Sequence, residues 1–387
     1  MTTWTTTVQR IGHLLESRFD QLRYRLKQQL KYDQPVQVVP YAGYGNAQHV
    51  YLKGRVLEYH GEDIEQAAEE SLWKNLANTY RRFESDEVPN LQLIAELGAF
   101  KQQTSTDEEG YFLFTLPTPK DLHADVLWHH ITVSVPTQPM LKTTPAPTVG
   151  KVLIPPPACD FGVISDMDDT ILVTNATSLL RMARLTFLHS PAMRLPFPGV
   201  AAFYRALQND GSVPRPLFYV SSSPWNLYDF LSEFMLLNQI PAGPLLLQDF
   251  GLDVDRLIHA SHRAHKLAQI THIMDTYPEL PFILIGDSGQ HDPEIYAEIV
   301  ANRAPQIHAI YIRDVSDNQR DEEVRRLAQQ ARQHGIDMLL VPDTLAAAEH
   351  ATTQGYIDSA SLTAIQTDFT KDTKPADLLE QALSDQP

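Results

Sequence analysis

Acidic residues crowd one short stretch of the sequence, directly after an apolar run. In GVISDMDDTILVTN (162–175), Asp166, Asp168 and Asp169 occupy three of four consecutive positions. Carboxylates this close repel one another and resist desolvation, so a folded chain needs something to compensate their charge. A phosphoryl-transfer site would do so, because one carboxylate attacks phosphorus, a second handles protons and Mg²⁺ offsets the repulsion.

Two simpler interpretations of this stretch explain less. A calcium loop of the EF-hand type needs glycine at its sixth position and glutamate at its twelfth. Counted from Asp166, those positions hold Ile171 and Thr177, which excludes the calcium loop. A solvated turn explains the acidic composition but not the hydrophobic FGVI that leads into it. The pattern therefore favours phosphoryl transfer.

A phosphoryl-transfer site also needs a hydroxyl, a cation and further carboxylates, and the chain offers each of them downstream. The stretch FYVSSSPWN supplies Ser221 and Ser222, and AHKLAQI supplies Lys266 at the head of an amphipathic run. FILIGDSGQHDPEIY adds Asp287 and Asp292, which suit a Mg²⁺ site. Each stretch alone is weak, but together and in this order they predict one site.

The elements that must position these residues are short apolar runs alternating with helical stretches between residues 158 and 345. The runs are FGVIS, PLFYVS, PLLLQD, FILIGD, HAIYIRD and DMLLVPD. Continuous apolarity indicates strands covered on both faces, which predicts an α/β fold with a doubly wound parallel sheet. Ligands of such sheets bind beyond the carboxyl ends of the strands, where several of these runs end in Asp or Ser.

The rest of the chain divides by pattern into four further segments. We expect an amphipathic helix over 1–35, a small β-sandwich with a helical insertion over 36–135, a semi-rigid linker over 136–157 and a loosely organised helical tail over 346–387. The linker assignment depends on seven prolines in 22 residues, since proline neither donates to a strand ladder nor continues a helix.

Bulk composition limits the partners and the compartment. A chain of 387 residues exceeds one ordinary core, so two domains are expected. The net charge of −17 argues against nucleic acid and against loose adhesion to anionic membranes. The single cysteine, the absence of a signal-peptide pattern and the absence of a run of roughly 18 apolar residues predict a cytoplasmic protein with at most peripheral membrane contact.

Several stretches resemble a known family. The motif Asp-x-Asp-x-Thr at 166–170 is that of the haloacid-dehalogenase-like (HAD-like) phosphohydrolases. FPGVAAFYRAL, FYVSSSPWNLYDFL, GPLLLQDFG, LIGDSGQHDPEIYAEI and AIYIRDV resemble the catalytic domain of the actin-patch-associated phosphatidate phosphatase family. The resemblance is dense over about 161–315 and weaker in PYAGYGNAQHVYLKGRVL and TDEEGYFLF, which are similar to bacterial members.

The resemblance implies a HAD-like Rossmannoid fold and assigns roles to the candidate residues. Asp166 would be the nucleophile that forms an aspartyl-phosphate, Asp168 the general acid and base, and Thr170 would orient that pair. Ser221 would bind a phosphoryl oxygen, and Lys266 would stabilise charge on the nucleophile and the phosphoryl group.

The remaining acids would belong to the metal site or lie beside it. Mg²⁺ would be held by Asp166, the backbone carbonyl of Asp168 and Asp287, with Asp292 as a ligand or as outer support. Asp169 occupies a variable motif position, so solvation or a helix-start contact is favoured over catalysis. Ser222 is a candidate for substrate binding, although it can equally form the turn before the proline.

The segment after the nucleophile bears on the substrate. From residue 170 to 209 the chain has no acidic residue but carries four arginines, among them Arg181 and Arg184, beside aliphatic residues. Residues 171–198 lie where this superfamily inserts substrate-covering caps, so we interpret them as contacting an anionic lipid such as phosphatidate. The alternative is an amphipathic helix packed on the sheet, with its arginines solvated.

Several functions therefore stay open. The leading one is a Mg²⁺-dependent phosphatidate phosphatase that yields diacylglycerol, and the nearest alternative is the same chemistry on a small soluble phosphoester. A signalling receiver uses similar groups but lacks a second acid two residues after the nucleophile, so Asp168 argues for turnover. A non-catalytic phosphate-binding or scaffold protein is the remaining class.

Overall fold

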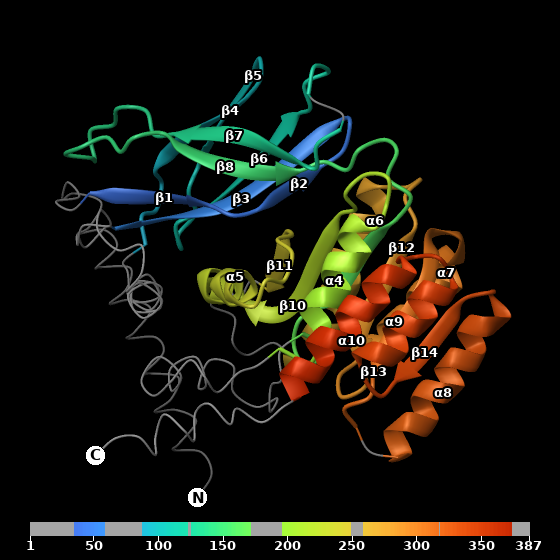
Figure 1. The fold of residues 1–387 in the computed structure, drawn as a ribbon. Helices are drawn as coiled ribbons and strands as arrows, with labels where there is room; N and C mark the ends of the chain where they lie inside the picture. Colours follow the sequence, from blue (N-terminus) through green and yellow to red (C-terminus); the bar gives the residue numbers. More distant parts are fainter. Residues whose placement is uncertain are drawn as a thin grey trace, which may run out of the picture.

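The computed structural model describes residues 35–58, 87–122, 125–171, 196–248, 258–316 and 318–373. The amino-terminal helix and most of the helical insertion predicted from the sequence lie outside these residues, as do Arg181 and Arg184. The described chain forms two sheets, one parallel and wrapped by helices and one mainly antiparallel (Figure 1). Within these ranges, no helix combines the length and the apolarity that a bilayer-spanning segment requires.

The parallel sheet confirms all six apolar runs as strands. They are β9 (Gly162–Asp166), β10 (Leu217–Pro224), β11 (Leu245–Gln248), β12 (Phe282–Asp287), β13 (Ile307–Arg313) and β14 (Asp337–Val341). Their order is β11-β10-β9-β12-β13-β14, and every neighbouring pair is parallel. The chain moves outward from β9 in one direction and then in the other, so β9 lies at the point where the strand order reverses, the place where such sheets bind ligands.

Helices cover both faces of this sheet. They are α4 (Val200–Asn209), α5 (Tyr228–Leu237), α6 (Ile258–Thr276), α7 (Asp292–Arg303), α8 (Asn318–Gln333), α9 (Thr344–Thr353) and α10 (Ser359–Thr373), with short 3₁₀ turns at Trp225–Leu227 and Ala304–Gln306. Buried residues of α6, α7 and α8 form one apolar cluster with the sheet, and those of α4, α5, α9 and α10 form another. The expectation of strands buried on both faces is confirmed.

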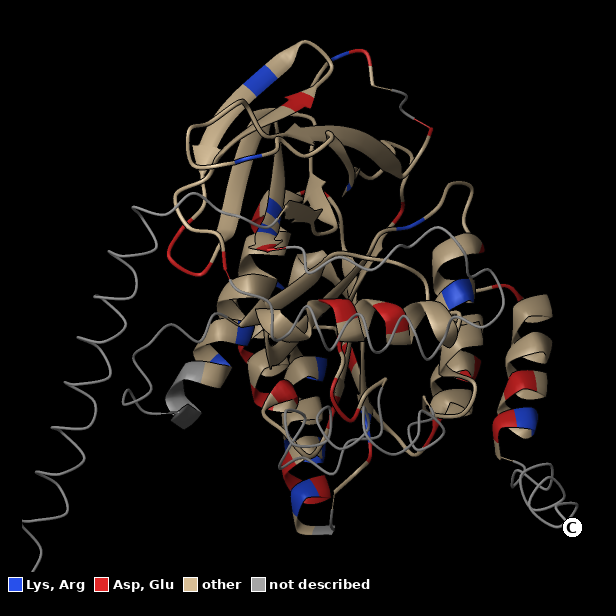
Figure 2. Ribbon diagram, turned by 90° about the vertical axis from the view of Figure 1, so that its left-hand side faces the viewer, with Lys and Arg blue, Asp and Glu red and all other residues tan. Residues whose placement is uncertain are grey.

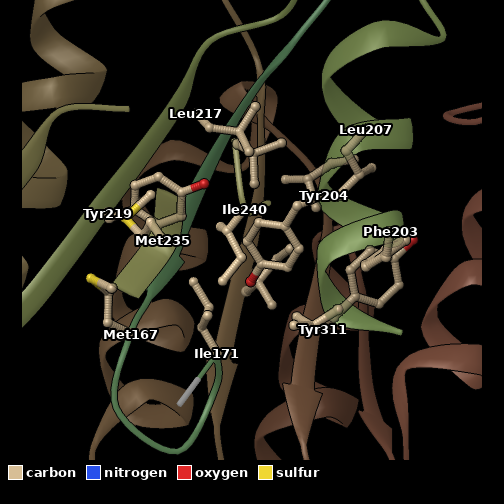
Figure 3. Close-up of a cluster of buried hydrophobic side chains, with 14 of the residues drawn as sticks. Met167, Ile171, Phe203, Tyr204, Leu207, Leu217, Tyr219, Met235, Ile240 and Tyr311 are labelled. Carbon is tan, nitrogen blue, oxygen red and sulfur yellow. The ribbon is translucent and has the colours of Figure 1, made fainter. Parts of the chain in front are cut away.

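The second of these clusters reaches under the loop that follows β9. Met167 and Ile171 are fully buried and point into it, toward aromatic residues that include Tyr204 and Tyr219 (Figure 3). Tyr204 and Tyr219 stack with their rings 6.3 Å apart. Burial of two apolar side chains that flank the acidic positions anchors this loop from below.

The amino-terminal sheet contains eight strands. They are β1 (Val36–Pro40), β2 (Gly43–Gly45), β3 (His49–Glu58), β4 (Gln92–Leu97), β5 (Phe100–Ser105), β6 (Tyr111–Pro117), β7 (Trp128–Ser134) and β8 (Thr148–Leu153). All pairs are antiparallel except β2 with β8. Hydrogen bonds join the strands into one sheet, β1-β3-β2-β8-β7-β4-β5 with β6 on β3, so the expected sandwich does not consist of two separate sheets.

Two further segments of the chain differ from the sequence-based expectation. The proline-rich segment 136–157 contains β8, because residues 148–154 are free of proline and alternate in burial. The described part of the segment predicted as a tail is packed rather than loose. Ile365 of α10 is fully buried, and Gly199 N donates a 2.9 Å hydrogen bond to Asp372.

Charges are mixed over the described surface. In the view of Figure 2, blue and red segments lie close together along the helices, and no broad basic face appears among the described residues. On α8, Arg320 pairs with Glu294 and with Glu323, and Arg325 lies 3.7 Å from Asp321. Arg320 and Arg325 are therefore paired with neighbouring carboxylates.

Arg215 is expected to be important for the stability of the parallel-sheet domain. Its guanidinium forms two 2.7 Å bonds to Asp160 and donates to the carbonyl oxygens of Leu207 and Tyr356, while its side chain is only 4% exposed. Arg215→Met should lower the free energy of unfolding by about 3 kcal/mol, because buried acceptors lose a charged donor.

The matched control is Arg205→Met, since Arg205 is 37% exposed and pairs with the equally exposed Asp368. That change should cost about 1 kcal/mol or less. Both values can be measured by urea denaturation followed by circular dichroism. Similar losses for the two variants would contradict the importance of Arg215.

Candidate active site

The carboxyl ends of three neighbouring strands bring the candidate residues together. β9 ends at Asp166, β10 carries Ser221 near its end and β12 ends at Asp287. Two helices contribute Lys266 from α6 and Asp292 from the first turn of α7. These side chains are all buried, although acids and amines are rarely buried without partners.

The loop after β9 combines buried acids with apolar side chains that belong to the core. Met167 and Ile171 point into that core, and Ile171 N closes the turn by donating to Met167 O at 3.0 Å. Asp166 is 1% exposed and Asp168 6% exposed. Asp169 has a positive φ of 54°, a left-handed conformation that Asp tolerates better than most residues.

Lys266 lies between two of the acids. Its Nζ is 2.7 Å from Asp166 Oδ1 and 2.7 Å from Asp292 Oδ1. Burial of the ammonium lowers the pKa of Lys266, but Asp166 and Asp292 together raise that pKa above its ordinary value. The raised pKa favours the charged ammonium of Lys266, which lies against the carboxylate predicted to be the nucleophile.

Ser221 contacts Asp168, a pairing that the sequence did not predict. Ser221 Oγ donates to Asp168 Oδ2 at 2.9 Å and accepts from Ser223 N at 2.9 Å. Thr170 Oγ1 lies 3.4 Å from Asp166 Oδ2, which is a long hydrogen bond. Ser222 is half-buried at the same strand end. The hydroxyl and the second acid therefore lie side by side above β9 and β10.

Asp287 and Asp292 are oriented by backbone groups. Asp287 Oδ1 accepts from Gly289 N at 2.7 Å and from Gln290 N at 2.9 Å, while Asp287 N lies 3.2 Å from Asp292 Oδ2. Asp292 comes this close because Gly286 has no side chain: a Cβ there would lie 2.6 Å from Asp292 Oδ2. The backbone donors of the GDSGQ turn were missed from the sequence, although Asp, Ser and Gly in succession are typical turn residues.

The arrangement fits a divalent cation. One carboxylate oxygen from each of Asp166, Asp287 and Asp292 lies within 4.8 Å of the others. Asp287 Oδ2 and Asp168 Oδ1 are buried and receive no hydrogen bond from the described residues. Hard oxygen ligands of this kind suit Mg²⁺. Since Asp292 already accepts from Lys266 and from the backbone, we regard Asp166 and Asp287 as the better ligands and Asp292 as their support.

Burial and mutual repulsion raise the pKa values of three of the acids above their ordinary values. Burial raises the pKa of Asp287 to about 8, with the Asp292 carboxylate adding to the shift. Burial also raises the pKa of Asp166 and of Asp168, although Lys266 opposes both shifts. Without a metal ion, these carboxyl groups therefore tend to retain protons, and a bound metal ion would displace the protons.

The sequence-predicted residues fall into two groups. Asp166, Asp168, Thr170, Ser221, Lys266, Asp287 and Asp292 converge at one edge of the parallel sheet. Arg181 and Arg184, predicted to contact substrate, lie outside the described residues. The chemistry available to the converged group is nucleophilic attack by a carboxylate beside a cation, with a second carboxyl group ready to exchange a proton.

Comparison with known proteins identifies the region that carries this site. Residues 161–314 match the family profile described as phosphatidate phosphatase APP1, catalytic domain. The chain is 34% identical over 208 residues to phosphatidate phosphatase APP1 of Saccharomyces cerevisiae, covering 54% of this chain and 31% of that protein. It is 30% identical over 156 residues to an uncharacterized protein of Schizosaccharomyces pombe, covering 40% of this chain and 25% of that protein.

The chain thus spans less than a third of the length of either fungal relative. Among solved structures, a carbohydrate acetylesterase from Xanthomonas citri aligns with 75% of this chain and 72% of its own, at 11% identity and a TM-score of 0.24. That likeness is too low to bear on the fold or the function.

The metal-free protein should lose stability as the pH rises from about 4 to about 8. An unfolded Asp titrates near pH 4, whereas folded Asp287 keeps its proton until about pH 8. The folded state is stabilised by that proton at low pH, and the contribution is lost as the pH rises through the folded pKa. Melting temperatures in chelator at pH 5 and pH 8 measure the effect.

Asp287→Asn supplies the control, since an amide cannot titrate. Its melting temperature should change less between the two pH values than that of the wild type. Added Mg²⁺ should raise the wild-type melting temperature more at pH 8 than at pH 5, because fewer protons compete with the ion. Equal pH dependence in both proteins would contradict the raised pKa of Asp287.

Proposed function

We propose that this chain, whose residues 161–314 match the family profile of the phosphatidate phosphatase APP1 catalytic domain, hydrolyses phosphate monoesters through an aspartyl-phosphate on Asp166. The observation that carries the proposal is the position of Asp166, which is paired with the buried Lys266 and lies two residues before a second buried acid, Asp168. A purely structural ion pair would not need the additional buried acids around it. The fold we infer for this region is the HAD-like Rossmannoid one.

The side chains divide the work between attack and proton transfer. Asp166 attacks phosphorus, while Lys266 compensates the charge on the nucleophile and on the phosphoryl oxygens. Asp168, with its raised pKa, holds a proton for the departing oxygen and then takes one from the hydrolytic water. The Ser221 hydroxyl turns from Asp168 to a phosphoryl oxygen when substrate enters.

A bound Mg²⁺ would be held by Asp166 and Asp287, supported by Asp292, and would neutralise negative charge near the phosphate. Without it, the four buried acids and one lysine carry a formal charge of about −3 when all are ionised, a state that burial opposes. The orphaned oxygen of Asp287 supports this assignment. Mg²⁺ is the cofactor we propose.

Phosphatidate is the substrate we propose, because it is the substrate in the name of the matched family and of the yeast relative. Its hydrolysis yields diacylglycerol and phosphate, and a lipid substrate requires peripheral membrane contact. A small soluble phosphoester remains the second candidate. The net charge of −17 favours it, since an acidic protein is repelled by anionic lipid surfaces.

Substitution of the two acids tests the catalytic proposal. Asp168→Asn should lower kcat by about 10²- to 10⁴-fold, the usual contribution of a general acid–base. Asp166→Asn should lower it by at least about 10³-fold, because the nucleophile is lost. Phosphate release from phosphatidate in mixed micelles and from p-nitrophenyl phosphate, with and without Mg²⁺, is the measurement.

Asp169→Asn is the matched control for both variants. It removes a neighbouring acid, and Asn tolerates the left-handed backbone at this position. Its kcat should stay close to that of the wild type. If Asp169→Asn were as inactive as Asp166→Asn, the assignment of the nucleophile would be wrong. Wild-type protein that released no phosphate from any substrate would leave only the binding or scaffold function.

The arginine-rich segment tests the lipid proposal. Arg181→Ala combined with Arg184→Ala should reduce hydrolysis of phosphatidate far more than hydrolysis of p-nitrophenyl phosphate, because the arginines are proposed to meet an anionic lipid surface. The ratio of the two kcat/KM values measures the selectivity. An equal loss on both substrates would favour the small-phosphoester alternative.

A further inference from the structure

The amino-terminal sheet contacts the very elements that deliver two of the catalytic groups. β2 and β3 pair as an antiparallel hairpin, and we refer to residues 41–53 as the docking hairpin. In Figure 1 these strands lie at the side of their sheet that faces β10 and α6. β10 carries Ser221 and α6 carries Lys266, so the hairpin touches both supports of the proposed site.

One contact lies four residues after Ser221, where β10 ends. Trp225 follows β10 directly, and the ring of Tyr41 stacks on it at 5.2 Å between centroids with planes 4° apart. The same tyrosine ring lies 3.9 Å from the ring of Tyr228, the first residue of α5. Lys53 Nζ lies 4.3 Å from the centre of the Trp225 ring. The segment that follows the serine-rich end of β10 is therefore held against the amino-terminal sheet.

A hydrogen bond from a backbone N–H fixes the orientation of the same contact. Ala42 N donates to the hydroxyl of Tyr228 at 2.7 Å, and Tyr41 is buried while Tyr228 is half-buried. Stacking alone permits sliding of the rings, whereas the hydrogen bond permits one register. Since Ser221 Oγ is oriented by Ser223 N, two residues before Trp225, a shift of this turn would move the hydroxyl.

A second contact lies on the helix of Lys266. Asn46 Nδ2 donates to Thr276 O at 2.8 Å, at the end of α6, and Tyr277 OH donates to Gly45 O at 2.9 Å. Tyr44 packs edge-on against both Phe218 of β10 and His272 of α6, at 5.8 and 6.0 Å between ring centroids. One tyrosine thus touches the strand of Ser221 and the helix of Lys266 together.

The hairpin is built for this close approach. A Cβ at Gly43 would lie 2.4 Å from Tyr51 O, and one at Gly45 would lie 2.3 Å from His49 O. Larger residues at either position would force the two strands of the hairpin apart. Gly43 and Gly45 are therefore needed for the close pairing of β2 and β3 within the docking hairpin.

We propose that the docking hairpin is a positioning element of the phosphatase, which holds Ser221 and Lys266 in register although none of its residues touches substrate. The proposal rests on the proposed function, since it assigns the hairpin to that reaction. Displacements of about 1 Å at reacting groups can cost on the order of 100-fold in rate, so a remote clamp can govern kcat. Interdomain packing without a positioning role would, by contrast, change the free energy of unfolding but not kcat.

Tyr41→Ala in the full-length chain tests the first contact. kcat on p-nitrophenyl phosphate should fall about 10- to 100-fold, with a much smaller change in KM, because misalignment acts on the transition state. Tyr41→Phe keeps the stacked ring and should restore most of kcat. Phe100→Ala is the matched control, since Phe100 is an aromatic residue of edge strand β5 that is 39% exposed.

Hydrogen–deuterium exchange measures positioning independently of catalysis. Tyr41→Ala should speed exchange in residues 217–228, and Asn46→Ala should do so in residues 266–277, while β13 and β14 stay protected. If Tyr41→Ala does not fold, Lys53→Met takes its place, because it removes the cation over Trp225 and keeps an apolar stem of similar length.

The outcomes separate this proposal from the proposed function. Wild-type protein without Mg²⁺-dependent, Asp166-dependent hydrolysis would overturn the function, and the exchange pattern alone would then decide whether the hairpin holds the site. Active wild type with an unchanged kcat in Tyr41→Ala would overturn the positioning role. So would faster exchange spread evenly over the chain, or an equal loss of activity in Phe100→Ala.

Discussion

Lys266 lies between two carboxylates in a site that is almost fully buried, and the rest of the site depends on this interaction. Four aspartates and one lysine sit at the edge of the parallel sheet, with no more than 6% of any of them exposed. Each of these groups alone would be costly to bury, and together the acids repel one another. The ammonium offsets part of that repulsion, and a divalent cation beside Asp166 and Asp287 would offset more. The cluster is thus stable only as a unit.

Short-range features of the chain bring the acids to this edge without unfavourable backbone contacts. Met167 and Ile171 hold the loop after β9 in the apolar core. Asp166 and Asp168 of the same loop instead contact Lys266 and Ser221. Gly286 allows Asp292 to approach the end of β12, and two backbone N–H groups orient Asp287. The apolar core therefore does more than stabilise the domain, because it anchors the loop that carries two of the acids.

The two sheets are coupled through the same edge. The amino-terminal sheet contributes aromatic and polar contacts to β10 and to α6, and these are the elements that deliver a hydroxyl and a cation to the site. A match to the catalytic-domain family covers only residues 161–314, so the docking hairpin lies outside the matched region. Through these contacts, the amino-terminal sheet supports the two elements, β10 and α6, that carry Ser221 and Lys266.

The sequence by itself determined the six strands of the parallel sheet and the residues at their ends, because apolar runs and strand-end acids are local patterns. Asp166 and Asp287 could be identified in this way, and Lys266 from its place at the head of an amphipathic run. Only the tertiary structure decided that Ser221 pairs with Asp168, that Lys266 bridges Asp166 and Asp292, and that Tyr41 stacks on Trp225. These contacts join residues far apart in the chain, and they follow from the strand order and from the docking of two sheets. Local periodicity encodes neither, since it reports which face of an element is apolar but not which partner covers it.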